Sequence, residues 1–313
     1  MYPSIPVLSA AVFAFTTLIT TVSILLVLVP QPIYSNFQSF APHTSLKHLA
    51  NLRQTHAAAA ETISNFNLIW QDDFTGVSLD PTKWSRFTGI PSNEEEETYP
   101  ANSDNCKLSG SGSLLITPEN TNGAWTSCRI ESVPAFEATA GKQMVVQSRF
   151  KLGTAGSFLQ GIWPAFWSLG DSMRHGTSWP ACGEIDTFEN INGGALGYGT
   201  LHCGSHCNDP SGLSAGIAFN YGDFHTWAHA IDLRNSDWTQ QSITYYMDGQ
   251  AYHLIKGSDV GDETAWKAAA QSPMYMILNV AVGGAWPGSA AANTASGSAA
   301  GMEVLYVGVY ESN

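Results

Sequence analysis

Charged residues are scarce in this sequence, and basic ones are especially so. Only 12% of its 313 residues are charged, with 13 Lys plus Arg against 26 Asp plus Glu. With 44% hydrophobic residues, this composition excludes a disordered chain, a collagen-like repeat, a coiled coil and a polytopic membrane protein. A net charge of −13 without any Lys/Arg cluster also excludes a nucleic-acid partner, because phosphate backbones are bound by basic surfaces.

Residues 1–60 lack acidic side chains altogether and carry only Lys47 and Arg53. They contain one uncharged run, residues 7–29, whose length favours a membrane anchor, since about 20 apolar residues span a bilayer and a signal peptide has about 7 to 15. The two basic residues follow the run rather than precede it, which gives only a weak orientation signal. We therefore keep two interpretations of residues 1–29, a signal anchor or a long cleaved signal peptide. Both predict a secreted or extracellular-facing protein, which the anchor would tether to a membrane.

Helical periodicity is nearly absent from the rest of the chain. Residues 30–65 show no sustained pattern and predict a linker, whereas residues 66–313 alternate short apolar runs with turn residues and predict a folded domain of strands. The Asp248-Gly249 pair predicts a tight hairpin, and residues 263–271 are the best helix candidate. This pattern favours a single large β-sandwich.

Cysteine is limited to five residues, all in the part predicted to be exported. An oxidising compartment predicts one or two disulfides, and an odd count leaves at least one thiol outside them. The close pair Cys203 and Cys207 favours a small disulfide-closed or turn-forming loop over zinc, because no second ligand pair follows at the required spacing. The sequence does not choose the pairing.

The chemically suggestive segment is residues 179–190, which places Glu184, Asp186 and Glu189 within six residues. In a regular strand Glu184 and Asp186 share one face and Glu189 points away, so one β-bulge is needed to bring all three together. Repulsion among three carboxylates raises at least one pKa, which separates a protonated acid from an ionised nucleophile. The pattern predicts glycoside cleavage, with a solvated acidic face or a cation site as alternatives.

These residues resemble the signature of glycoside hydrolase family 16, in its laminarinase-like endo-1,3(4)-β-glucanase branch. That branch carries Glu, one residue, Asp, two residues, Glu on a bulged strand, and a related branch with one residue fewer includes lichenases and cell-wall transglycosylases. The resemblance extends from about Leu68 to Tyr310. Further blocks that resemble the family, in family order, are residues 161–169, 200–202, 224–227, 246–249, 278–288 and 302–307.

The resemblance implies an all-β fold, a concanavalin-like jelly-roll sandwich of two antiparallel sheets with a concave substrate cleft, and makes residues 66–313 the catalytic domain. It implies retaining, internal hydrolysis of β-1,3 or mixed β-1,3/1,4-glucan. Glu184 would be the nucleophile and Glu189 the acid/base, with Asp186 tuning the nucleophile. The alternatives are a β-glucan transglycosylase of the same fold and a non-catalytic glucan-binding protein.

Several further residues are predicted to contact sugar. Aromatic rings stack on the C–H faces of sugars, and positions that resemble the family's histidine, arginine and asparagine add polar contacts. These candidates are Trp163, Trp167, Trp179, Trp286, His202, Arg129 and Asn93. The acidic run 94–97 departs from the family, and its plain interpretation is a solvated loop.

The predicted reaction needs no organic cofactor, and we predict no catalytic metal. The resemblance allows a structural calcium ion, but no Asp/Glu spacing predicts an EF-hand loop. No Asn-x-Ser/Thr site is present, so N-glycosylation is not expected. We expect a monomer whose partner is a β-glucan polysaccharide.

Overall fold

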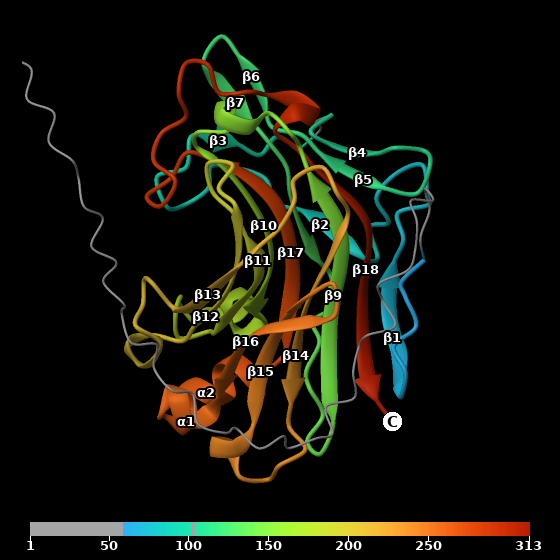
Figure 1. Cartoon of the computed structure of the whole chain (residues 1–313), viewed down its shortest axis with the longest axis vertical. Coiled ribbons are helices and arrows are strands. Elements are labelled where there is room, and N and C mark those ends of the chain that lie inside the picture. The colour runs from blue at the N-terminus through green and yellow to red at the C-terminus, as the bar shows by residue number, and fades with distance from the viewer. Residues whose placement is uncertain (1–58, 102–103) are drawn as a thin grey trace, which may run out of the picture. The chain divides into compact units, whose positions relative to one another are not determined.

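Two large antiparallel sheets face each other in the computed structural model, which describes residues 59–101 and 104–313 (Figure 1). The predicted anchor or signal peptide and most of the predicted linker lie outside these residues. The last part of the predicted linker lies against the first sheet, where Glu61 pairs with Arg149 at 3.2 Å and Ile63 is buried.

The first sheet has eight strands in the order β16-β15-β14-β9-β18-β5-β4, with β1 also paired to β18. Its strands are β1 (Phe66–Asp72), β4 (Cys106–Leu108), β5 (Leu114–Ile116), β9 (Gln143–Leu152), β14 (His225–Asp232), β15 (Ser242–Met247), β16 (Gln250–Lys256) and β18 (Met302–Ser312).

The second sheet has seven strands in the order β13-β12-β11-β10-β17-β8-β2. They are β2 (Trp84–Arg86), β8 (Arg129–Ser132), β10 (Ile162–Gly170), β11 (Glu184–Glu189), β12 (Leu196–His202), β13 (Leu213–Ala218) and β17 (Met274–Val282). A small third sheet joins β3 (Glu97–Thr98), β7 (Ala124–Thr126) and β6 (Glu119–Thr121). The prediction of an all-β sandwich is confirmed.

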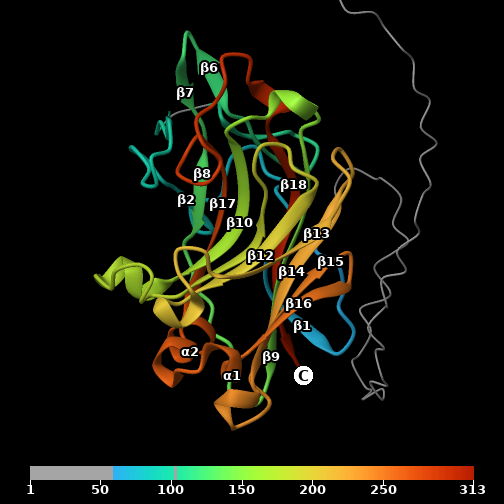
Figure 2. The same cartoon turned by 60° about the vertical axis from the view of Figure 1, so that its left-hand side comes forward.

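Helices are short. They are α1 (Gly257–Val260) and α2 (Glu263–Ala270), together with the 3-10 turns Gly156–Phe158, Asp171–His175, Ser205–Cys207, Trp238–Gln240 and Gly297–Ala299. The predicted helix is α2, where the Asp262 carboxylate accepts the Ala265 N–H as N-cap and Trp266 is buried. Both helices lie at the opposite end of the sandwich from β6 and β7 (Figures 1 and 2). Neither helix in residues 59–101 and 104–313 has the length and apolar character of a membrane span.

The core between the sheets is built on aromatic side chains. Phe188 of β11 lies 4.5 Å from the Trp227 ring of β14 and 5.0 Å from the Phe150 ring of β9, centroid to centroid. All three side chains are at most 1% exposed. Since deleting a buried aromatic side chain costs about 3 to 5 kcal/mol, this contact fixes β11 against the first sheet.

Turns and disulfides follow the predicted local chemistry. Asp248 and Gly249 both have positive φ and close the β15–β16 hairpin. Disulfides join Cys106 to Cys128 and Cys203 to Cys207, and Cys182 is buried as a free thiol. The prediction of one or two disulfides is confirmed, and of the two forms left open for the 203–207 loop the structure has the disulfide-closed one.

Candidate active site

The three predicted carboxylates are brought together on β11 by a β-bulge. Relative to β12, Asp186 pairs with Thr200 and Glu189 pairs with Tyr198, so two residues of β11 lie opposite one residue of β12. The pairing of β11 with β10 shifts register at the same place, between Phe166 and Trp167 of β10. The extra residue returns Glu189 to the face of Glu184 and Asp186, and the predicted bulge is confirmed.

The bulge is held from the core side. Thr187 Oγ1 hydrogen-bonds to Nδ1 of His229 on β14 at 2.7 Å, and Phe188 next to it joins the aromatic core. Burial lowers the pKa of His229 to about 3, so this ring is neutral at physiological pH. Opposite the bulge is Gly199, where a Cβ atom would lie 2.5 Å from Tyr245 and Tyr252 side-chain atoms. A larger residue at this position would push β12 away from the core.

His202, on the neighbouring strand β12, binds the acidic cluster. Its Nε2 lies 3.3 Å from Oδ2 of Asp186 and 4.0 Å from Oε1 of Glu184. Its Nδ1 bonds to Asp209, which follows β12. Burial opposes a charge on His202, yet the contact with Asp186, the charges of Asp186 and Glu184 and the hydrogen bond to Asp209 raise its pKa to about 10. The ring is therefore an imidazolium at neutral pH.

The carboxyls of the cluster hold protons unusually tightly. Burial, followed by repulsion from Asp186, raises the pKa of Glu189 to about 8 and raises the pKa of Glu184 well above its ordinary value. Burial also raises the pKa of Asp186, with His202 opposing the shift. The imidazolium beside Asp186 and Glu184 opposes these shifts, so the three carboxyls and His202 share their protons as one group.

Glu189 is oriented by an indole. Trp163 of β10 donates its Nε1–H to Oε1 of Glu189 at 2.9 Å. Trp286 packs edge-on against Trp163, with ring centroids 5.6 Å apart, and is 44% exposed. Tyr198 of β12 also packs edge-on against Trp286, with ring centroids 5.6 Å apart. An aromatic group of three rings therefore lies next to Glu189.

Trp179 lies at the other end of the carboxylate row. It is 41% exposed, and its ring centroid lies 5.8 Å from that of His202. An exposed indole beside a buried ionic cluster is able to stack on a sugar ring that reaches Glu184.

Arg129 and Trp167 occupy strands on the other side of β11. Arg129 of β8 bonds to Glu131 at 2.7 Å and covers the rings of Trp167 at 4.9 Å and Phe87 at 4.8 Å. Trp167 donates its Nε1–H to Oδ1 of Asn279 at 2.8 Å. Arg129 therefore lies on the same face as the carboxylates, with its guanidinium partly neutralised by Glu131.

The acidic run after Asn93 departs from its expected structure. Asn93 is exposed and its carbonyl accepts the Ala285 N–H at 2.8 Å, so it lies in a loop joined to the Trp286 segment. Glu97 is 1% exposed and accepts the Val282 N–H, and burial followed by repulsion from Glu97 raises the pKa of Glu95 to about 8. The solvated-loop interpretation of residues 94–97 is wrong for these two positions, because backbone pairing of Glu95 with Gly283 draws the run inward.

The cluster has two chemical interpretations. Glu184, Asp186 and His202 offer ligand atoms that lie within 4.8 Å of one another, a geometry that could hold a cation. However, both nitrogens of His202 face carboxylates, and its raised pKa keeps both protonated, which leaves no lone pair for a metal. The arrangement fits proton sharing among carboxyls better than metal binding. A carboxylic acid and a carboxylate on one strand face, beside exposed indole rings, are what glycosidic cleavage requires, and the fold and site together define a glycoside hydrolase.

Comparison with known proteins gives the family. A family model described as an XgeA-like, catalytic GH16 domain matches residues 92–225. The glucan endo-1,3-beta-glucosidase A1 of Niallia circulans is 31% identical over 273 residues, covering 80% of this chain and 38% of that protein. The keratan-sulfate endo-1,4-beta-galactosidase of Sphingobacterium multivorum is 29% identical, covering 85% of this chain and 60% of that protein.

A solved structure agrees with the sequence relatives. The endo-1,3-beta-glucanase from Streptomyces sioyaensis has a TM-score of 0.77 and 31% identity, covering 82% of this chain and 100% of that chain. The chain belongs to glycoside hydrolase family 16, and its sandwich is the family's jelly roll. It spans less than two thirds of the length of the two sequence relatives above.

Sequence reasoning missed several residues of this face. Tyr198 lies four residues before His202 on the same strand, so strand alternation alone could have placed it beside Glu189. Asn279 lies in a block that resembles the family but carries no chemical signal of its own. Asp209 carries no sequence signal of its own, because only the closed Cys203–Cys207 loop brings it back to His202.

Proposed function

We propose that this protein is a retaining endo-acting hydrolase of β-1,3 or mixed β-1,3/1,4-glucans. The observation that carries the proposal is the β-bulge at Thr187, which places Glu184, Asp186 and Glu189 on one face of β11. Support for the substrate class comes from the Niallia and Streptomyces relatives, which are named as enzymes acting on 1,3-β-glucan.

In the first step, the Glu184 carboxylate attacks the anomeric carbon while Glu189 donates its proton to the glycosidic oxygen. The glycosidic bond breaks, the leaving sugar departs as an alcohol, and a glycosyl ester forms on Glu184. A pKa of about 8 keeps Glu189 protonated at neutral pH, as this step requires. The imidazolium of His202, 4.0 Å from Glu184, favours the ionised nucleophile.

In the second step, the Glu189 carboxylate takes a proton from water, whose oxygen attacks the anomeric carbon. The ester bond breaks, Glu184 returns to a carboxylate, and the anomeric configuration is retained. Trp163 donates to Glu189 and so holds its carboxyl in place for both proton transfers. Trp286, which contacts Trp163, would stack on the leaving sugar.

The experiment is glucan hydrolysis by the purified chain. Reducing-sugar release from laminarin, lichenan and cellulose is measured, product lengths are resolved, and a parallel run contains an oligosaccharide acceptor. We expect short products from laminarin with the β-anomer formed first, and we expect E184Q to abolish turnover but keep binding. Elongated acceptors without net hydrolysis would instead identify a transglycosylase, and binding without any bond cleavage would identify a glucan-binding protein.

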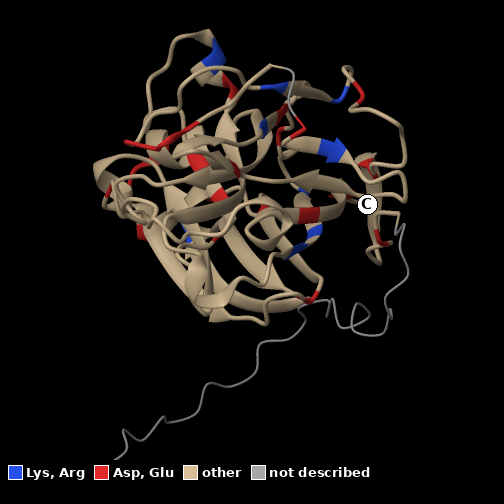
Figure 3. Cartoon of the chain, turned by 90° about the horizontal axis from the view of Figure 1, so that it is seen from above, with Lys and Arg blue, Asp and Glu red and all other residues tan. Residues whose placement is uncertain are grey.

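We also propose that the protein is exported, acts as a monomer and uses no organic cofactor. Export is supported by the apolar run 7–29 and by two disulfides in the folded part. The composition supports a carbohydrate partner rather than nucleic acid, and Lys and Arg are scattered rather than gathered on one face (Figure 3). Fractionation of the source cells, with and without detergent, would separate a released protein from a membrane-anchored one.

A further inference from the structure

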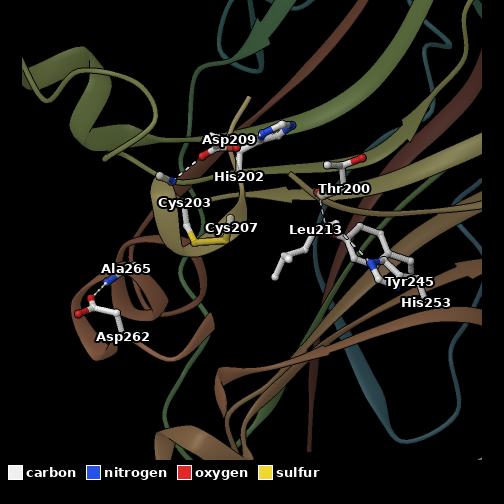
Figure 4. Close-up of a disulfide and its surroundings, with 11 residues drawn as sticks. Thr200, His202, Cys203, Cys207, Asp209, Leu213, Tyr245, His253, Asp262 and Ala265 are labelled. Atoms are coloured by element: carbon white, nitrogen blue, oxygen red, sulfur yellow. Dashed lines mark hydrogen bonds and ion pairs between the residues drawn. A yellow bond between two sulfur atoms is a disulfide. The ribbon is translucent and has the colours of Figure 1, made fainter. Parts of the chain in front are cut away.

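A disulfide-closed loop follows directly after the histidine of the site. His202 ends β12, the Cys203–Cys207 disulfide closes the next five residues around a 3-10 turn, and Asp209 follows two residues later. Figure 4 shows His202 and Asp209 side by side above the disulfide. The loop therefore folds the chain back so that Asp209 reaches the imidazole.

Asp209 is fully engaged by these contacts. Its Oδ1 bonds to Nδ1 of His202, and its Oδ2 accepts the backbone N–H of Gly204 inside the disulfide loop. Its side chain is only 7% exposed, so water does not compensate its charge. A buried carboxylate with one oxygen on the loop and the other on the imidazole links the two rigidly.

We propose that Asp209 is a positioning residue that holds His202 charged and aimed at the carboxylate row, and that the Cys203–Cys207 disulfide fixes Asp209 for this task. The proposal rests on the proposed glucan hydrolysis for its kinetic consequences. Its structural part, the state of the His202 ring, is independent of that function.

The groups around the imidazole define what the contact does. On the β11 side His202 faces Asp186 at 3.3 Å and Glu184 at 4.0 Å, with Glu189 farther along the strand, and the exposed Trp179 ring packs beside it. With Nδ1–H held by Asp209, the Nε2–H points toward Asp186. Without Asp209 the Nδ1–H loses its acceptor, the ring loses its orientation, and the proton leaves at a lower pH.

The loss of that proton matters for the reaction. A neutral His202 no longer opposes the burial and repulsion that favour a protonated Glu184. Glu184 then holds its proton up to a higher pH, and a smaller fraction of the nucleophile is ionised at a given pH. Removal of Asp209 should therefore lower kcat more than it changes KM, and it should move the acidic limb of the kcat profile, which reports the ionisation of Glu184, to higher pH.

The first test is an NMR titration of the His202 ring in the full chain, with the resonance identified by comparison with H202Q. We expect the wild-type ring to stay protonated at pH 8 and D209N to lower its midpoint by at least one pH unit. D223N, which neutralises an exposed aspartate between β13 and β14, is the matched control and should leave the midpoint unchanged. A wild-type ring that is neutral at pH 8, or equal midpoints in wild type and D209N, would overturn the proposal, whether or not the chain cleaves glucan.

The second test is kinetic, with laminarin as substrate. D209N should lose about 10- to 100-fold in kcat, comparable with removing the hydrogen-bonded partner of a metal-binding histidine. D209E, which keeps an acceptor carboxylate, should restore part of the lost kcat and should shift the limb of the kcat–pH profile less than D209N does. A D209N variant with wild-type kcat and pH profile would contradict the positioning role.

The third test separates the two disulfides. C203S/C207S should lower kcat in the same direction as D209N but by less. C106S/C128S is the control, since its disulfide spans 22 residues rather than 4 and should contribute more to stability. The control should lower Tm more while leaving the His202 midpoint in place. A C203S/C207S variant with an unchanged midpoint and kcat would remove the disulfide from the proposal.

Discussion

Replacing Glu189 with Gln should stabilise the folded domain at alkaline pH. Glu189 is 9% exposed and its pKa in the folded state is about 8, against an ordinary value of 4.5. Between these two values the folded state holds a proton that the unfolded state has released, so each pH unit lowers stability by about 1.4 kcal/mol. The stability that the protonated Glu189 carboxyl contributes to the folded state is fully present below pH 4.5 and is lost as the pH rises to about 8. Gln carries no proton to lose and still accepts the Trp163 N–H.

The expected difference between E189Q and wild type is near zero at pH 4 and about 4 kcal/mol at pH 8.5. For a domain of this size that corresponds to roughly 8 to 16 °C in Tm. Thermal unfolding of both proteins from pH 4 to 8.5 measures it, with E119Q on the exposed strand β6 as the control whose difference should not vary with pH. The other carboxyls of the cluster titrate in both proteins, so only the difference reports on Glu189. A difference in Tm that is constant with pH would refute the inference that Glu189 is held protonated by the fold.

Three further predictions concern the bulge and the aromatic group. F188A should lower the free energy of unfolding by about 3 to 5 kcal/mol in urea, because the side chain is fully buried, and a loss below 1 kcal/mol would contradict its role in the core. Deletion of Thr187 should leave the three carboxyls at alternate positions of a regular strand, on one face, so measurable laminarin hydrolysis should remain. Loss of the hydrogen bond to His229 should lower the free energy of unfolding by about 1 to 3 kcal/mol. Complete inactivity in a folded protein would mean that the bulge geometry itself orients the acid. W286A should raise KM about 5- to 10-fold with little change in Tm, because this exposed ring touches Trp163 without entering the core, and an unchanged KM would exclude it from sugar binding.

Local backbone geometry was predictable from the sequence where a residue spacing or a residue type allows only one conformation. The spacing of Glu184, Asp186 and Glu189 requires a bulge if all three share a face, and the structure has that bulge at Thr187. The Asp248-Gly249 turn followed from dihedral preference in the same way. Strand identity and the sandwich class followed from short apolar runs, because two packed sheets are the arrangement that buries them.

Contacts that depend on tertiary packing were not predictable. The burial of Glu97 follows from its bond to Val282, a partner 185 residues away, and no local pattern signals it. Cysteine pairing likewise depends on the folded structure, since spacing alone leaves the pairing open.

The bulge couples the site face to the core. In a regular strand each inward side chain is followed by an outward one, but here Thr187 and Phe188 both serve the core, one through His229 and the other through Trp227. Because Thr187 and Phe188 both face the core, the next residue, Glu189, lies on the outward face of the strand. The apolar packing beneath β11 therefore offsets the repulsion among the carboxyls above it, and a change at either anchor must move the acid relative to Glu184. Stability and catalysis are for this reason expected to change together along β11, and to separate only at the exposed aromatic rings that hold substrate.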